Sequence, residues 1–198
     1  MTMSAQAERF RRAADGFQAR IAAVPADRWN APSPCPAWTA RDVAVHVIHE
    51  ARRVVATVRG ARPAELHGIG LAEMGTLPAT APDADLAAAW EEISAALTAA
   101  IDDPACHTAK MPTPVGEVPF TDVIEVLPED VLIHTWDLAR ATGGDERLDP
   151  GLVAHVHEHL KPMDEALRQP WAFGPKTPVP DGADPQTEFL CFVGRNPN

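Results

Sequence analysis

Apolar residues recur at steps of three and four along much of the chain, which is the pattern of helices that bury one face. The first such stretch covers residues 5–24, with an apolar stripe at Phe10, Ala14, Phe17, Ile21 and Val24. Four prolines within residues 24–38 exclude a helix interior there. We therefore predict a loop, with Trp29 and Trp38 as buried anchors toward its two ends.

Two further helices have recognisable beginnings. Thr39 suits an N-cap and Asp42 lies three residues on, so an approximate capping box predicts a helix to about Arg59. Asp83 or Asp85 begins the next helix. Its apolar face is formed by Leu86, Trp90, Ile93, Leu97 and Ile101.

In the C-terminal half of the chain, prolines and glycines indicate where helices begin, end or bend. After a helical turn over residues 120–126, Pro128 fits the first turn of a long helix that stops at Gly143. Residues 149–168 are predicted to form another helix, with a kink at Pro162.

Three segments lack a helical period. Residues 61–81 are predicted to be loop with one short helix near Leu71 and Met74, and residues 105–119 an extended excursion or short hairpin. Residues 169–198 are rich in proline and glycine until an apolar run near the end, which could be a short helix or strand.

Together these elements predict an all-α fold of four or five helices, with an extra short helix or hairpin. Residues 1–168 would form the bundle, and residues 169–198 an arm packed on it as part of the same domain. A chain of 198 residues is long enough to bury a sizeable core.

Charge and cysteine content narrow the function classes. The chain has 28 acidic and 17 basic residues, a net charge of −11, which argues against a nucleic-acid partner. The sequence shows no apolar run near the ~20 residues that span a bilayer and no apolar signal segment at its start, so no membrane partner is expected. Three cysteines without metal-type spacing fit reduced thiols in a cytoplasm.

Two histidines stand within otherwise apolar helical runs. His46 interrupts a stripe of valines, and His134 follows Asp130 by four residues, which places both on one helix face. Two imidazoles and a carboxylate would make a three-ligand metal site with open positions. Asp137 lies on the same stripe, where it could accept the other ring N–H of a ligand histidine. The alternative is that each histidine is a hydrogen-bonded core residue.

These segments resemble the actinobacterial metal-binding family related to mycothiol-dependent maleylpyruvate isomerase, within the DinB-like superfamily of four-helix bundles. The resemblance covers nearly the whole chain in order. It is carried by Trp29, by Ser33-Pro34-Cys35-Pro36-Ala37-Trp38-Thr39-Ala40-Arg41-Asp42 with His46, by His134-Thr135-Trp136-Asp137-Leu138-Ala139-Arg140-Ala141-Thr142-Gly143, by Phe173-Gly174-Pro175, and by Phe192-Val193-Gly194-Arg195-Asn196-Pro197.

The resemblance implies a divalent metal held by His46, Asp130 and His134. The isomerase has glutamate at the acidic position, where this chain has the shorter Asp130. Glu129 is adjacent, but it would point about 100° away around the helix. Zinc suits such a ligand set best, and nickel, iron or manganese would also fit.

The expected reaction follows from the metal and the family together. A coordinated thiol loses its proton, whereas a free one has a pKa near ~8.5. We therefore expect a metal-dependent thiol transferase or thiol-assisted isomerase, with mycothiol as co-substrate and a small electrophile as substrate. A hydrolase or lyase that uses water is one alternative, and a non-catalytic binding or dimerising bundle is another.

Other side chains were weighed for roles at this site. Trp136, Arg41 and His49 are candidates for contacting the substrate, and a homodimer is a further expectation. Several arginines could bind a carboxylated substrate or thiol, with solvated surface as the alternative: Arg41, Arg52, Arg53 and Arg195. Cys35 is either a packing thiol or a nucleophile. His155 and His159 share a helix face that we expect to be exposed.

Overall fold

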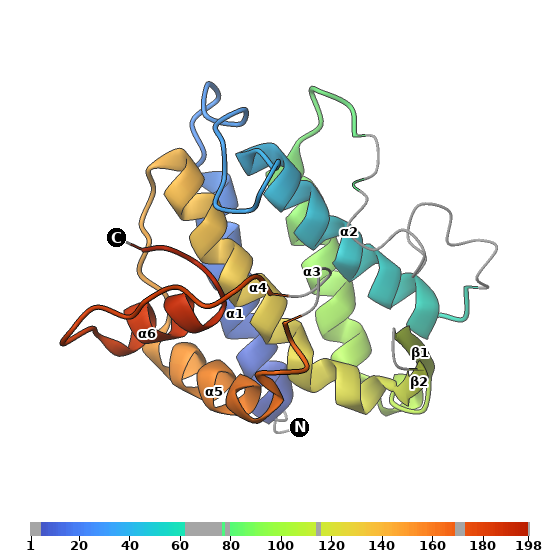
Figure 1. Ribbon diagram of the computed structural model, residues 1–198. Helices are drawn as coiled ribbons and strands as arrows, with labels where there is room; N and C mark the ends of the chain where they lie inside the picture. The colour runs from blue at the N-terminus through green and yellow to red at the C-terminus, as the bar shows by residue number, and fades with distance from the viewer. Residues whose placement is uncertain (1–4, 62–76, 78–79, 114–115, 169–172, 198) are drawn as a thin grey trace.

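Six α-helices and a two-stranded hairpin make up the part of the chain that the computed structural model describes, residues 5–61, 77, 80–113, 116–168 and 173–197 (Figure 1). The helices are α1 (Ala5–Ala22), α2 (Ala40–Val58), α3 (Leu86–Asp102), α4 (Phe120–Thr142), α5 (Pro150–Leu160) and α6 (Pro185–Phe192). Strands β1 (Lys110–Thr113) and β2 (Gly116–Pro119) pair antiparallel between α3 and α4. Short 3₁₀ turns follow α3 and α5.

The first four helices form a closed ring. α1 packs against α3 and α4, and α2 packs against the same two helices from the other side. Several of the largest core side chains, such as Phe17 of α1 and Trp90 of α3, come from these helices and are fully buried, and the two rings meet edge to face at 5.0 Å between centroids. Burial of this apolar surface is the main favourable term in folding. The mostly helical bundle therefore confirms the predicted fold class at that level.

Several helix boundaries lie where local capping signals predicted them. Thr39 and Asp42 form the predicted capping box at the start of α2. Asp85 accepts the backbone N–H of Ala88 at the start of α3, and Gly143 ends α4 in the left-handed conformation at φ 75°. Residues 105–119 do contain the short hairpin.

Two proline boundaries were predicted wrongly. α4 does not begin at Pro128 but runs unbroken from Phe120 through it. Phe120 and Ile124 are buried on the core face. Their packing keeps the helix intact although Pro128 has no backbone N–H to donate. Conversely, Pro162 does not kink α5: the helix ends at Leu160, and a 3₁₀ turn contains the proline.

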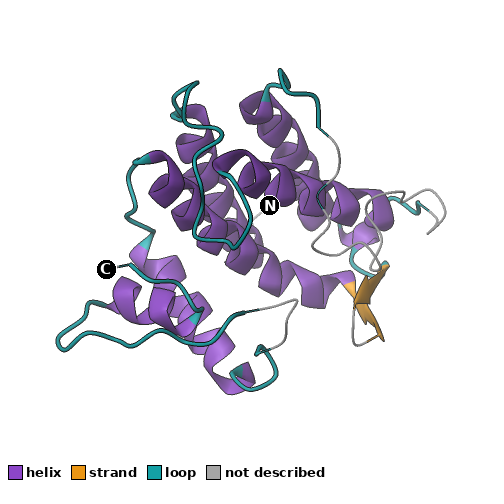
Figure 2. Ribbon diagram, turned by 45° about the horizontal axis from the view of Figure 1, so that its top comes forward, coloured by secondary structure: helices purple, strands orange, loops and turns teal. Residues whose placement is uncertain are grey.

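The segments outside the ring lie at different places around it (Figure 1). Figure 2 shows the loop before α2 crossing the end of the bundle, where Arg28 Nη2 donates to the carbonyl of Ala141 at 3.0 Å. Its two tryptophans, Trp29 and Trp38, are half-buried rather than fully buried. α6 packs on α5, and the apolar run near the C-terminus is helical rather than a strand. The short helix expected near Leu71 and Met74 falls outside the described residues.

Among the helices described, none combines the length and the apolar character that crossing a membrane requires.

Candidate functional site

His46, Asp130 and His134 converge where α2 packs against α4. Asp130 and His134 lie one helical turn apart on α4, and His46 faces them from α2. Asp130 Oδ1 lies 3.5 Å from His46 Nε2 and 3.4 Å from His134 Nε2. The three ligand-type atoms all lie within 4.8 Å of one another. Two nitrogens and one oxygen at this spacing could share one divalent cation.

The two imidazoles are covered on one side and open on the other. The Trp38 ring lies 4.9 Å from the His46 ring and 6.0 Å from the His134 ring, centroid to centroid. The side chains of His46 and His134 are 18% and 10% exposed, while that of Asp130 is 45% exposed. The group therefore opens on the carboxylate side, where coordination positions would remain for a ligand.

Asp130 and the two histidines favour each other's charged forms. Burial alone would raise the pKa of Asp130, but the nearby His134 and His46 outweigh burial and hold it well below its usual range. Burial would likewise lower the pKa of His134, yet Asp130 and Asp137 raise it well above the ordinary value. The negative Asp130 oxygen between the two imidazoles attracts positive charge, and a metal bound there would displace the proton from His134, because a ligand imidazole is neutral.

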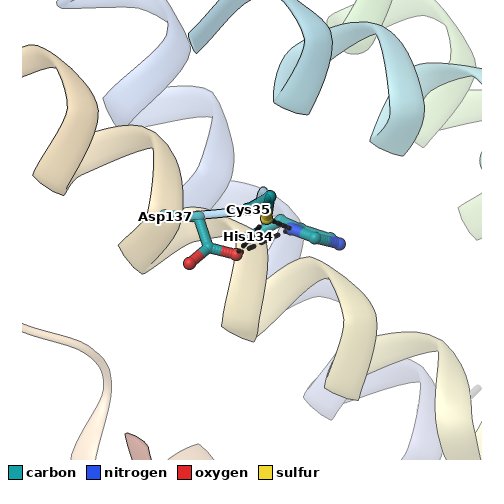
Figure 3. Close-up of side chains that lie close together, drawn as sticks. All are labelled: Cys35, His134 and Asp137. Atoms are coloured by element: carbon teal, nitrogen blue, oxygen red, sulfur yellow. Dashed lines mark hydrogen bonds and ion pairs between the residues drawn. The ribbon is translucent and has the colours of Figure 1, made fainter. Parts of the chain in front are cut away.

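A second group shares His134 and consists of Cys35, His134 and Asp137 (Figure 3). His134 Nδ1 donates to Asp137 Oδ2 at 2.9 Å, and Cys35 Sγ donates to the same oxygen at 3.3 Å. Because Asp137 engages Nδ1, His134 presents Nε2 to Asp130 and His46. A carboxylate behind a ligand histidine fixes the ring and its tautomer in this way.

The position of Arg195 makes the second group the less favourable place for a metal. Its Nε and Nη2 donate to the two oxygens of Asp137 at 3.0 and 2.6 Å, and Nη2 lies 3.5 Å from Cys35 Sγ. Asp137 is fully buried, which would raise its pKa, but Arg195 and His134 hold that pKa far below the usual range. A divalent cation there would sit against a guanidinium. The group of His46, Asp130 and His134 is therefore the more favourable one.

A chamber of about 980 Å³ opens beside His46, Asp130 and His134, which we call the metal-type group. α2 and α4 form its long walls, and Phe173, Gly174, Pro175, Gly194 and Arg195 of the C-terminal segment also line it. Gly194 has a φ of +79°, and a Cβ there would meet the Pro175 carbonyl oxygen at 3.0 Å. This glycine therefore allows the two parts of the segment to approach beside Arg195.

Glu129 also lines the chamber and contacts His159 of α5 through Oε1 and Nδ1. Burial raises the pKa of Glu129 to about 7, against the opposing effect of His159. The sequence did not indicate this pair. The periodicity of α4 sets Glu129 apart from Asp130, and the histidines of α5 were expected on an exposed face.

The three sequence candidates for contacting the substrate, Trp136, Arg41 and His49, do not line the chamber. Trp136 is 1% exposed in the core, with Arg140 over its ring at 5.8 Å. Arg41 donates to the carbonyl of Ala81, and neither it nor His49 is among the described residues that line the chamber. By contrast, Arg53 of α2 does line it. Cys35 and Arg195 line it as well, and both lie in segments without a helical period.

Comparison with known proteins finds one matching family model and two similar proteins. Residues 10–139 match the sequence model described as the mycothiol maleylpyruvate isomerase N-terminal domain. Two uncharacterized proteins of Mycobacterium tuberculosis, from strains CDC 1551 / Oshkosh and ATCC 25618 / H37Rv, are each 32% identical to the chain. Each match covers 93% of this chain and 94% of the relative. No solved structure matches significantly.

Proposed function

The chain belongs to the family of the mycothiol maleylpyruvate isomerase N-terminal domain, and on that premise we propose a metal-dependent enzyme that joins a small thiol to an electrophile. The observation that carries the proposal is the convergence of His46, Asp130 and His134 at the wall of a large chamber. The ring of four helices also supports a DinB-like bundle.

The proposed metal ligands are His46, Asp130 and His134, with zinc as the metal that best suits two nitrogens and one oxygen. The shorter aspartate is compatible with this role because Oδ1 lies within 3.5 Å of both imidazoles. Asp137 would hold His134 in place through Nδ1, and Arg195 would hold Asp137. Trp38 would shield one side of the two rings from water.

A divalent metal bound there would act as a Lewis acid that lowers the pKa of a thiol in one of its open positions. We propose a mycothiol-type thiol as co-substrate, because the family is named for that thiol. The chamber would admit the electrophile from the exposed side of Asp130. The reaction would then be a thiol transfer, or an isomerisation in which the thiol adds and leaves again.

We also propose that the protein acts in the cytoplasm on a small-molecule substrate. Cys35, Cys106 and Cys191 are all free thiols, which is compatible with a reducing compartment. The homodimer expected from the sequence stays a prediction.

Thiol consumption measures this function directly. Purified protein with added zinc is expected to consume mycothiol in the presence of at least one member of a panel of small electrophiles, and chelation should abolish it. Asp130→Asn should lose the activity, whereas Asp122→Asn, an exposed carboxylate on the same helix, should retain it. If turnover of an electrophile is metal-dependent but proceeds equally without thiol, a hydrolase or lyase replaces the proposal.

A further inference from the structure

We propose that Arg168 is a positioning residue for the candidate metal site. It holds together two segments of the C-terminal arm that line the chamber, and through them it keeps Arg195 on Asp137. Arg168 does not itself line the chamber. The inference rests on the proposed function only for the role that it gives His134, whose ring Asp137 orients. The contacts that carry it involve neither a metal nor a thiol.

The chain that leads into α6 and the chain that leaves it both reach the chamber. Residues 173–175 line it from the first segment, and Gly194 and Arg195 line it from the second. Thr177 joins the two segments, because its backbone N–H donates to the carbonyl of Cys191 at 3.1 Å and its hydroxyl donates to the carbonyl of Arg195. The position of Arg195 therefore depends on how these two segments are held.

One guanidinium contacts both segments and the turn after α5. Arg168 Nη1 donates to the carbonyl of Gly174 at 2.8 Å, and Nη2 donates to the carbonyl of Phe192 at 2.8 Å. Its Nε and Nη2 also donate to Asp164 Oδ1 at 3.0 and 2.7 Å, and Lys176 pairs with the same carboxylate. Because a guanidinium is a planar fork of donors, one side chain can hold all three partners at once.

The contact with Phe192 lies where α6 ends. Carbonyls in the last turn of a helix lack partners within the helix, so the groups that donate to them hold the chain as it leaves. Arg168 donates to the carbonyl of Phe192, and the N–H of Arg195 donates to that of Leu190 at 2.8 Å. The guanidinium of Arg168 also lies 5.1 Å from the ring centroid of Phe192 and 6.0 Å from that of Phe173. Arg168 therefore fixes the exit from α6 three residues before Arg195.

Arg195 connects this clamp to the histidine. Its Nε and Nη2 donate to the two oxygens of Asp137 at 3.0 and 2.6 Å, and Asp137 accepts Nδ1 of His134 at 2.9 Å. Asp137 is 0% exposed, so water cannot replace the guanidinium without a rearrangement. If the exit from α6 shifts, Asp137 loses its cation and holds the ring of His134 less firmly.

Hydrogen exchange of the full chain without metal tests the clamp itself. In Arg168→Gln, the hydrogen-bonded amides of Thr177 and Arg195 should exchange about tenfold faster, because two charge-assisted bonds to the segments are lost and local opening becomes easier. Amides of the four helices of the ring should exchange as before. Arg147→Gln is the matched control, since that side chain is 89% exposed, and it should exchange like wild type.

Two further variants separate positioning from general stability. Arg168→Lys keeps a charge beside Asp164 but has a single nitrogen, so it should not restore wild-type exchange. In urea unfolding, the combined loss of Arg168→Gln and Arg195→Met should be clearly smaller than the sum of the single losses, because a released Arg195 contributes less. Two independent structural roles would add.

Zinc affinity, measured by competition with a chelator, then connects the clamp to the metal site. Arg168→Gln should bind zinc about tenfold more weakly than wild type and Arg147→Gln, with its helical circular dichroism unchanged. Wild-type exchange in Arg168→Gln, full recovery in Arg168→Lys, additive losses, or unchanged zinc affinity would each overturn the inference. The proposed function fails separately: if wild-type protein consumes no thiol with any electrophile, the exchange and unfolding results still decide whether Arg168 places Arg195.

Discussion

At the scale of single residues, the site depends on partners far apart in the sequence. The spacing of Asp130 and His134 was readable, because one helical turn fixes it. The interrupted apolar stripe made His46 a candidate for the third ligand and the resemblance supported it, but no local pattern places α2 beside α4. The contact of Arg195 with Cys35 and Asp137 could not be predicted from spacing, because loops and the C-terminal segment bring them together.

The Asp137–Arg195 pair should dominate the stability of this region. Arg195→Met would leave a fully buried carboxylate without its cation, so we expect a loss of about 3 kcal/mol in the free energy of unfolding at pH 7. Arg147→Met is the matched control, because Arg147 is 89% exposed and pairs with a half-exposed Asp145. It should cost less than about 0.5 kcal/mol. Urea unfolding of the three proteins measures both differences.

The pH dependence of that loss has a definite sign. The pKa of Asp137 is depressed in the folded protein, so its contribution is present above the unfolded value and is lost as pH falls toward the folded one. Without Arg195, only His134 would oppose the effect of burial, so the pKa of Asp137 should rise and acid should protonate and relieve the buried charge. The gap between wild type and Arg195→Met should therefore narrow between pH 7 and pH 4. A gap that stays constant would contradict the account.

At the scale of elements, local signals and tertiary packing decide different boundaries. The beginnings of α2 and α3 were predictable, because Thr39 and Asp85 cap them with their own side chains. The boundaries at Pro128 and Pro162 were not. Pro128 stands inside a helix whose two ends are both held by the core, whereas α5 ends before Pro162, which lies in a 3₁₀ turn. Phe120 and Ile124 supply that hold for α4.

Pro128 should therefore limit the stability of α4. Pro128→Ala restores a backbone N–H and removes the ring from the preceding turn, at the cost of a more flexible unfolded chain. We expect a gain of about 1–2 kcal/mol in the free energy of unfolding. Pro150→Ala is the control, since Pro150 occupies the first turn of α5, where no N–H is needed. A larger loss in Pro128→Ala than in Pro150→Ala would show that α4 needs the proline.

At the scale of the whole molecule, the ring of four helices both builds the core and leaves the chamber beside the metal-type group. Helix periodicity predicts the buried faces well, because burial repeats with the turn of each helix. It does not predict the chamber, whose walls consist of the same apolar residue types as the core. Polar positions such as His46, Glu50 and Arg53 mark that wall only once the helices are placed.

The central claim is that His46, Asp130 and His134 hold one divalent metal, and elemental analysis of purified protein tests it most directly. We expect close to one equivalent of zinc or a similar ion per chain. His46→Ala should lose it while retaining its helical circular dichroism, and His155→Ala, a histidine of α5 outside the group, should keep it. Wild-type protein without stoichiometric metal after purification and zinc loading, or unchanged metal content in His46→Ala, would contradict the account.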